Sequence, residues 1–98
     1  MAAAARVLRL SPLDNVAVTT GRVAAHAPVE LDGVAYWTTE EIPLGHKMAL
    51  RPILVGEKVL KFGVPIGSAT RAIAPGELVH VHNIESDYIV NDIDHHED

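Results

Sequence analysis

The sequence predicts a small, mostly β domain of short strands, with at most one or two helical turns. Its 98 residues are the length of one domain. Seven glycines and six prolines interrupt it, so no apolar pattern of period 3.6 lasts more than about two turns. The segments between them are short and rich in β-branched residues, and they recur about every eight to twelve residues, as in a small barrel or clip.

The first half of the chain predicts four short strands separated by turn residues. They lie at residues 7–10, 16–20, 28–31 and 34–38. Asp32-Gly33, between the last two, is a strong signal for a tight hairpin. Residues 23–26 fit a helical turn as well as an extended stretch, so both alternatives stay open there.

The second half predicts further extended segments between glycine and proline turns. They lie at residues 46–50, 58–62, 65–71 and 78–82. Gly63 ends the second of these, and Pro75-Gly76 makes a turn before the last, because proline sets one corner and glycine accepts positive φ at the next. The sequence shows no internal repeat, no glycine-rich dinucleotide motif and no phosphate-binding loop.

The composition excludes several classes of function. Thirteen acids against eight bases give a net charge of −5, which argues against nucleic acid as a partner. No run of about eighteen apolar residues is present, so we expect no membrane span. The absence of cysteine excludes a disulfide framework, a thiolate zinc site and a cysteine nucleophile in these residues, and is compatible with the cytoplasm, where we expect this protein.

The acidic charge is concentrated at the end of the chain. Residues 85–98 carry six of the thirteen acids and no lysine or arginine, which leaves residues 1–84 with seven acids and eight bases. We therefore predict a domain over residues 1–84 and an acidic extension over 85–98. Apolar residues within 84–93 suggest that this stretch docks on the body or on a partner, and the ligand-rich residues 94–98 are expected to be a solvated tail.

The stretch His80-Val81-His82-Asn83 is the most informative candidate site. In a strand, His80 and His82 would share one face about 7 Å apart, where two imidazoles can converge on one metal or anion. The valines would then face the core, and the Asn83 amide would add a hydrogen-bonding group. The alternative is a solvated strand face with no function.

Gly45-His46-Lys47 and Lys61 provide the other candidates. Gly45 lets the backbone approach a ligand closely, His46 can act as a general base or metal ligand, and Lys47 can neutralise a carboxylate. Lys61, next to an apolar neighbour and close to the turn at Gly63, is a candidate anion contact. The alternatives are ordinary surface polarity and, for Lys61, a sheet-edge lysine that discourages aggregation.

Four phrases of the sequence occur together in a characteristic order and spacing. They occupy residues 14–18, 42–50, 56–69 and 73–83. Together they resemble the SAF-type domain of the altronate and galactarate dehydratase family, over roughly residues 6–84. The matched motifs are Gly45-His46-Lys47, Lys61 and His80-x-His82-Asn83, while Phe62 stands where tyrosine is common.

The resemblance implies a β-clip fold and a carbon–oxygen lyase reaction, in which a hydroxylated sugar acid loses water across C2–C3. The implied catalytic residues are His46, Lys47, Lys61 and Asn83. Of these, Lys47 and Lys61 would bind the substrate carboxylate. A divalent metal, iron(II) or manganese(II), would be held by His46, His80 and His82 or by a partner subunit.

The resemblance also implies a partner and leaves alternatives. A chain of this size looks like the small subunit of a two-subunit enzyme, inactive alone and completed by a large catalytic subunit. A related interpretation is the small subunit of sulfolactate sulfo-lyase, which eliminates sulfite from a similar 2-hydroxy acid. Two others are a non-catalytic SAF module that binds a ligand and an assembly element that forms homo-oligomers.

Overall fold

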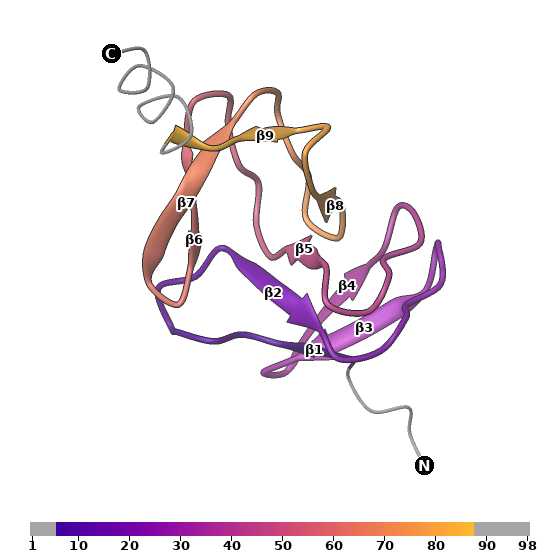
Figure 1. Cartoon of the computed structure of the whole chain (residues 1–98). Coiled ribbons are helices and arrows are strands. Elements are labelled where there is room, and N and C mark those ends of the chain that lie inside the picture. Colours follow the sequence, from indigo (N-terminus) through magenta and orange to yellow (C-terminus); the bar gives the residue numbers. More distant parts are fainter. Residues whose placement is uncertain (1–5, 88–98) are drawn as a thin grey trace, which may run out of the picture.

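Nine short strands make up the regular structure of residues 6–87, which the computed structural model describes (Figure 1). They are β1 (Val7–Leu8), β2 (Val16–Thr19), β3 (Pro28–Leu31), β4 (Val34–Trp37), β5 (Lys47–Ala49), β6 (Lys58–Lys61), β7 (Val64–Ala69), β8 (Leu78–Val79) and β9 (Ile84–Glu85). This confirms the prediction of a small, mostly β domain. None of the described residues forms a helix long and apolar enough to cross a membrane.

The strands form three antiparallel sheets. A four-stranded sheet has the order β1-β2-β5-β8, a hairpin pairs β3 with β4, and a three-stranded sheet has the order β6-β7-β9. In Figure 1 the β3–β4 hairpin and the β6-β7-β9 sheet lie at opposite ends of the molecule, with β2 and β5 between them. The four-stranded sheet therefore connects the two smaller sheets.

Two of the hairpins have the same two-residue turn, but only one was predicted. Asp32 and Gly33 both have positive φ, 54° and 80°, which confirms the hairpin between β3 and β4. Phe62 and Gly63, at 62° and 73°, make the equivalent turn between β6 and β7. The prediction that the strand continues through Phe62 was wrong, because a bulky aromatic residue gives no local signal for a left-handed backbone.

A short turn unit occurs four times within residues 6–87, so the prediction of no internal repeat was wrong. Each copy has a buried branched residue in an isolated bridge and, three positions later, a residue with positive φ that precedes a strand. The pairs are Val23 with His26, Ile42 with Gly45, Ile53 with Gly56, and Ile73 with Gly76. A third position is also shared, because the residue six positions after the first is buried in every copy: Val29, Met48, Val59 and Val79. Three of the copies read Ile-x-x-Gly, a signal that was present in the sequence. Residues 23–26, left open above, are one such bridge and turn.

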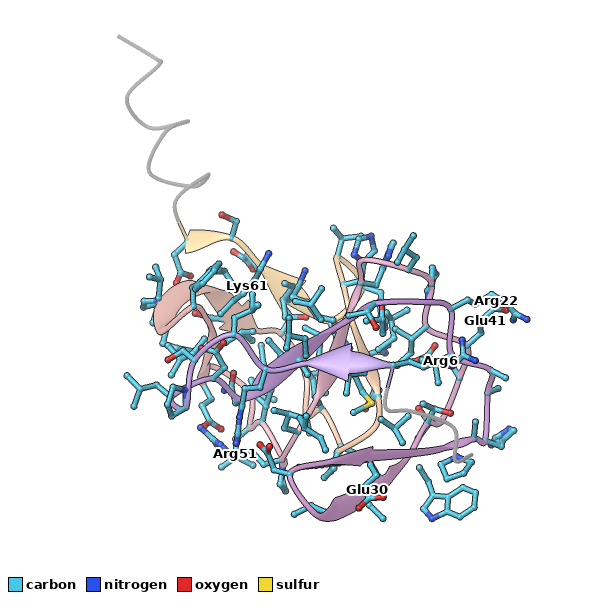
Figure 2. The ribbon with its side chains drawn as sticks, turned by 90° about the horizontal axis from the view of Figure 1, so that it is seen from below. Arg6, Arg22, Glu30, Glu41, Arg51 and Lys61 are labelled. Carbon is cyan, nitrogen blue, oxygen red and sulfur yellow. The ribbon has the colours of Figure 1, made fainter. Side chains whose placement is uncertain are left out.

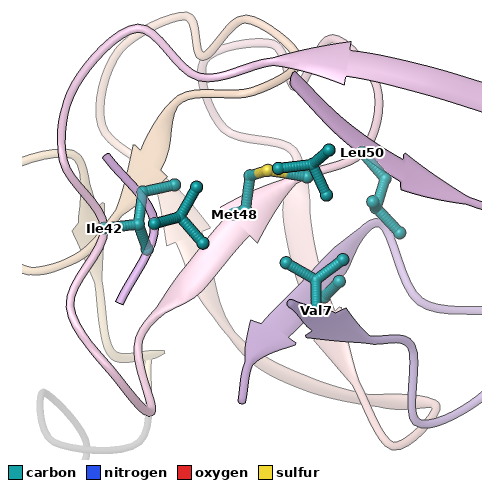
Figure 3. Close-up of a cluster of buried hydrophobic side chains, with 7 residues drawn as sticks. Val7, Ile42, Met48 and Leu50 are labelled. Carbon is teal, nitrogen blue, oxygen red and sulfur yellow. The ribbon is translucent and has the colours of Figure 1, made fainter. Parts of the chain in front are cut away.

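The four-stranded sheet packs a hydrophobic core on each of its two faces. Ala17 and Met48, opposite each other on β2 and β5, belong to the first core, shown in Figure 3 with Ile42 beside Met48. Their neighbours Val16 and Ala49 point the other way and belong to the second core. Both faces of β2 and β5 are therefore buried, which ties the two ends of the molecule to one sheet.

The last predicted strand, residues 78–82, is wrong beyond Val79. β8 ends there, the chain bends at His80 and turns through Asn83, and Val81, expected in the core, is 79% exposed. Asn83 closes this turn: its Oδ1 accepts a hydrogen bond from the His80 amide at 2.9 Å, and its Nδ2 donates to the Leu78 carbonyl at 2.8 Å. These local side-chain bonds compete with continuation of the strand.

The chain remains attached to the body past the predicted boundary between 84 and 85. β9 spans this position and pairs with β7. Asp87 accepts hydrogen bonds from Lys58 at 2.6 Å and from Ser68 at 3.0 Å, and these contacts lower the pKa of its carboxyl group below its ordinary value. The rest of the predicted acidic extension, with the ligand-rich residues 94–98, lies outside the described residues.

Candidate functional site

The candidate site is built around the start of β5. The fourfold turn unit places Gly45 at a φ of 80° just before His46 and Lys47. Thr19 anchors this turn, because its hydroxyl accepts a hydrogen bond from the His46 amide at 3.1 Å and donates to the Pro43 carbonyl at 2.6 Å. The start of β5 is therefore held to β2 by a buried side chain as well as by the sheet.

The pairing of β5 with β8 brings two histidines together. Lys47 lies opposite Val79, so His46, just before β5, and His80, just after β8, lie next to each other beyond the strand ends. Their ring centroids are 4.8 Å apart, with the ring planes inclined at 46°. The bend after Val79 separates His80 from His82, so the two do not share a strand face as predicted.

His80 has a depressed affinity for protons. Partial desolvation lowers its pKa below the ordinary 6.5, and the positive charges that His46, Lys47 and His82 carry when protonated lower it further. The lowered pKa favours the neutral imidazole, the form that can accept a proton from a substrate or coordinate a metal.

Lys47 and Lys61 form a cationic pair from β5 and β6. Lys47 is half-buried, and its pKa falls below 10.5 because of that burial and because of the positive charge of Lys61. Neither ammonium group forms an ion pair with an acid of residues 6–87. Two cations without an acidic partner in residues 6–87 leave a local positive charge that can attract a carboxylate.

Asn83, predicted to be catalytic, lies behind the histidines. It is 0% exposed, and its oxygen and nitrogen are both hydrogen-bonded to the backbone around His80 and Leu78. In this arrangement its amide shapes the turn that carries His80 and His82. The structure therefore brings His46 and His80 into contact, with Lys47 near His80 and Lys61 near Lys47, and Asn83 holds the turn that carries His80.

A different set of residues offers metal ligands. Glu40, Glu77 and His82 each present one ligand atom, and these atoms lie within 4.8 Å of one another. Carboxylate oxygens with an imidazole nitrogen suit a divalent metal such as manganese or iron. His46 and His80, predicted as ligands together with His82, lie outside this set.

Sequence reasoning named neither glutamate of this set. Glu77 accepts a hydrogen bond from the Ala74 amide at 2.9 Å within its turn, and its position three residues before His80 was an available signal. Glu40 accepts one from the Leu78 amide at 3.3 Å. It lies 37 residues earlier in the chain, and only the tertiary structure brings it to β8.

A hollow of about 400 Å³ opens elsewhere, beside β3, and its charges are mixed. Arg6 and Arg22 line it together with Glu30. The Arg22 guanidinium is paired with Glu41 at 3.1 Å, and Figure 2 shows these two side chains next to each other. Arg6 forms no ion pair with residues 6–87, and Glu30 adds a negative charge to the same lining.

Comparison with known proteins agrees with the fold and the motifs. The model of the altronate/galactarate dehydratase SAF domain matches residues 5–87. The chain is 37% identical over 87 residues to an altronate dehydratase of Escherichia coli, covering 89% of this chain and 17% of that protein. A Bacillus subtilis altronate dehydratase is 32% identical over 79 residues, covering 81% and 16%.

A second kind of relative is much shorter. The (2R)-sulfolactate sulfo-lyase subunit alpha of Chromohalobacter salexigens is 45% identical over 47 residues, which cover 48% of this chain and 50% of that protein. The chain thus spans less than a fifth of the two dehydratases and half of this subunit. The match over residues 5–87 confirms the resemblance seen in the motifs: the chain belongs to the altronate/galactarate dehydratase SAF domain family.

Proposed function

We propose that this chain binds the carboxylate end of a sugar acid within a lyase that removes water from such substrates, altronate or galactarate among them. One observation carries the proposal: Lys47, which has no ion pair within residues 6–87, lies near His80 of the His46–His80 pair and near Lys61, which is also unpaired there. Family membership supports a lyase, since the relatives include altronate dehydratases.

The proposed reaction divides the roles among these side chains. Removing the proton from C2 leaves electron density on the adjacent carboxylate, and the ammonium groups of Lys47 and Lys61 would stabilise that charge. The imidazole of His80 or of its neighbour His46 would accept the proton. The C3–O bond then breaks, the hydroxyl group leaves as water by taking up the proton held by the imidazolium, and the resulting enol rearranges to the 2-keto-3-deoxy acid.

A divalent metal, iron(II) or manganese(II), is part of the proposal. Within residues 6–87, the set that would hold it is Glu40, Glu77 and His82, whose oxygen and nitrogen donors fit such an ion. When bound there, the metal would supply a Lewis acid for the departing hydroxyl group. The partner remains the alternative location for the ion.

The site needs a larger partner to enclose a substrate. His80 and His82 are exposed, and an open surface does not exclude water from the reacting atoms. We propose that a catalytic region of several hundred residues covers it, either as a separate large subunit or as a continuation of the same polypeptide. The chain covers only 17% and 16% of the length of the two altronate dehydratases, which supports a larger catalytic region beside it.

A second candidate function is the elimination of sulfite from sulfolactate. The 45% identity to a sulfo-lyase alpha subunit favours it. Sulfolactate also presents a carboxylate beside a hydroxyl group, so the same lysines would bind it. The two functions differ in the leaving group.

The test is a hybrid enzyme in which this chain replaces the matching region of the Escherichia coli altronate dehydratase. Dehydration of altronate and galactarate and release of sulfite from sulfolactate are measured with iron(II) and with manganese(II). Lys47→Met and Lys61→Met should each lower kcat/KM by a factor of about 100 or more. Arg71→Met, which removes an exposed charge outside the site, is the matched control and should have little effect. Full activity of both lysine variants, or of the dehydratase without this region, would overturn the proposal.

A further inference from the structure

Asp14 and Asn15 form a buried polar pair that connects two parts of the candidate site. They are 6% and 0% exposed and directly precede β2. A buried carboxylate normally requires a cation or several hydrogen-bond donors. Asp14 has no ion pair with residues 6–87, and its partners are all backbone amides.

Asp14 holds the turn at the tip of the β6–β7 hairpin. Its Oδ2 accepts a hydrogen bond from the Phe62 amide at 2.9 Å, and its Oδ1 accepts one from the Gly63 amide at 2.7 Å. Oδ2 also accepts from the Ser11 amide at 3.1 Å. Phe62 has a φ of 62°, a conformation that costs a non-glycine residue about 1–2 kcal/mol. The hydrogen bonds from the carboxylate offset this cost and select the turn.

Asn15 holds the strand that leads into this turn. Its Nδ2 donates to the Lys58 carbonyl at 2.9 Å, and its Oδ1 accepts from the Leu60 amide at 2.8 Å. β6 is an edge strand of its sheet, so these groups face away from β7. The Asn15 side chain thus takes the place of a neighbouring strand, because it bonds the backbone carbonyl of Lys58 and the backbone amide of Leu60 at the sheet edge.

Lys61 lies between the two anchored segments. The residue before it is held by Asn15 and the residue after it by Asp14. The same two residues lead into β2, whose Val18 pairs with Lys47 on β5, and the Asn15 carbonyl accepts a hydrogen bond from the Leu50 amide at 2.9 Å. A continuous series of side-chain hydrogen bonds and strand pairing therefore connects the segment of Lys61 through Asp14 and Asn15 to Lys47.

We propose that Asp14 and Asn15 are positioning residues that hold Lys61 next to Lys47, so that the two ammonium groups bind one carboxylate. The use of this arrangement for a carboxylate rests on the proposed function. The anchoring of the hairpin tip does not, and it is tested separately.

The first test is amide hydrogen exchange in the unmodified chain. Phe62 and Gly63 lie in an exposed turn, yet their amides should exchange at least about tenfold more slowly than those of Asp32 and Gly33. The latter turn has the same backbone conformation and no side-chain acceptor within residues 6–87. Equal exchange at the two turns would overturn the proposal, and this comparison needs no variant that must fold.

The second test is a double-mutant cycle on kcat/KM of the hybrid enzyme, with Asp14→Asn, Lys61→Met and both together. Asp14→Asn should lower kcat/KM at least tenfold when Lys61 is present and less than twofold when it is absent, because Asp14 acts through Lys61. Asp14→Glu, which keeps the carboxylate, should recover part of the loss. A merely structural role would give equal losses in both backgrounds, and that result would overturn the proposal. An inactive hybrid would count against the proposed function, while the exchange comparison still decides the anchoring.

Discussion

Asn83 illustrates, at the scale of a single residue, how a polar side chain within a functional motif can serve the fold. Sequence reasoning placed its amide beside the two histidines as a chemical group, because residue type and spacing do not show which way a side chain points. In the structure it is fully buried and bonded to the backbone at both ends. Its contribution to the site is the position of the histidine-bearing turn.

Asn83→Ala should lower the free energy of unfolding by about 1–3 kcal/mol, because it leaves the His80 amide and the Leu78 carbonyl without their partner. Urea denaturation measures the change. His82→Ala, at an exposed position of the same turn, is the control and should alter stability by less than about 0.5 kcal/mol. Equal effects of the two substitutions would show that Asn83 does not hold the turn.

The second prediction at this scale concerns the titration of His80. Its pKa should lie below 6.5, and Lys47→Met should raise it by removing a nearby positive charge. Because the folded pKa is the lower one, the associated stability is present above pH 6.5 and is lost as the pH falls through the folded pKa. NMR titration of the metal-free chain gives the value, and a pKa at or above 6.5 would contradict the prediction.

At the scale of elements, the residues of each turn decide whether its hairpin can be predicted from the sequence. Asp32-Gly33 is a sequence in which both residues favour positive φ, so the β3–β4 hairpin was predicted. Phe62-Gly63 adopts the same turn, but Phe62 does so because Asp14 binds its amide from another segment. A turn selected by a distant side chain leaves no local signal.

The recurring turn unit gives a prediction about two of its glycines. Gly56 and Gly76 have nearly the same φ, 84° and 88°. A Cβ on Gly56 would meet nothing within 4 Å, whereas one on Gly76 would lie 2.0 Å from the Trp37 carbonyl oxygen. Gly56→Ala should therefore cost about 1–2 kcal/mol of backbone strain. Gly76→Ala should cost clearly more, because the end of β4 must move away. Urea midpoints measure both, and equal losses would contradict the close approach.

At the scale of the whole molecule, the two cores share one sheet. β2 and β5 send alternate side chains into each core, so neither core is complete without them. The candidate site has the same dependence, because it takes residues from β5, from β6 and from the turn after β8. We therefore expect the two ends of the molecule to unfold together.

Ile42→Ala tests this expectation from the first core. The residue is fully buried, and its truncation should cost about 2–5 kcal/mol. Fluorescence of Trp37, the single tryptophan, reports the end of the molecule with β3 and β4, and NMR signals of Val59 report the second core. Both probes should shift to the same lower urea midpoint. Loss of the tryptophan transition while the Val59 signals persist would show independent ends.

The sequence by itself determined the strand-rich class, the hairpin at Asp32-Gly33, the family and the residue types of the site, because turn chemistry, β-branched runs and short motifs are local properties. Only the tertiary structure decided that the strand after Leu78 bends at His80, that Glu40 joins Glu77 and His82, and that Asp14 and Asn15 anchor Lys61. Each of these depends on hydrogen bonds or packing between segments far apart in the chain. The physical reason is that a side chain's orientation is set by the partner it meets, and sequence spacing does not identify that partner.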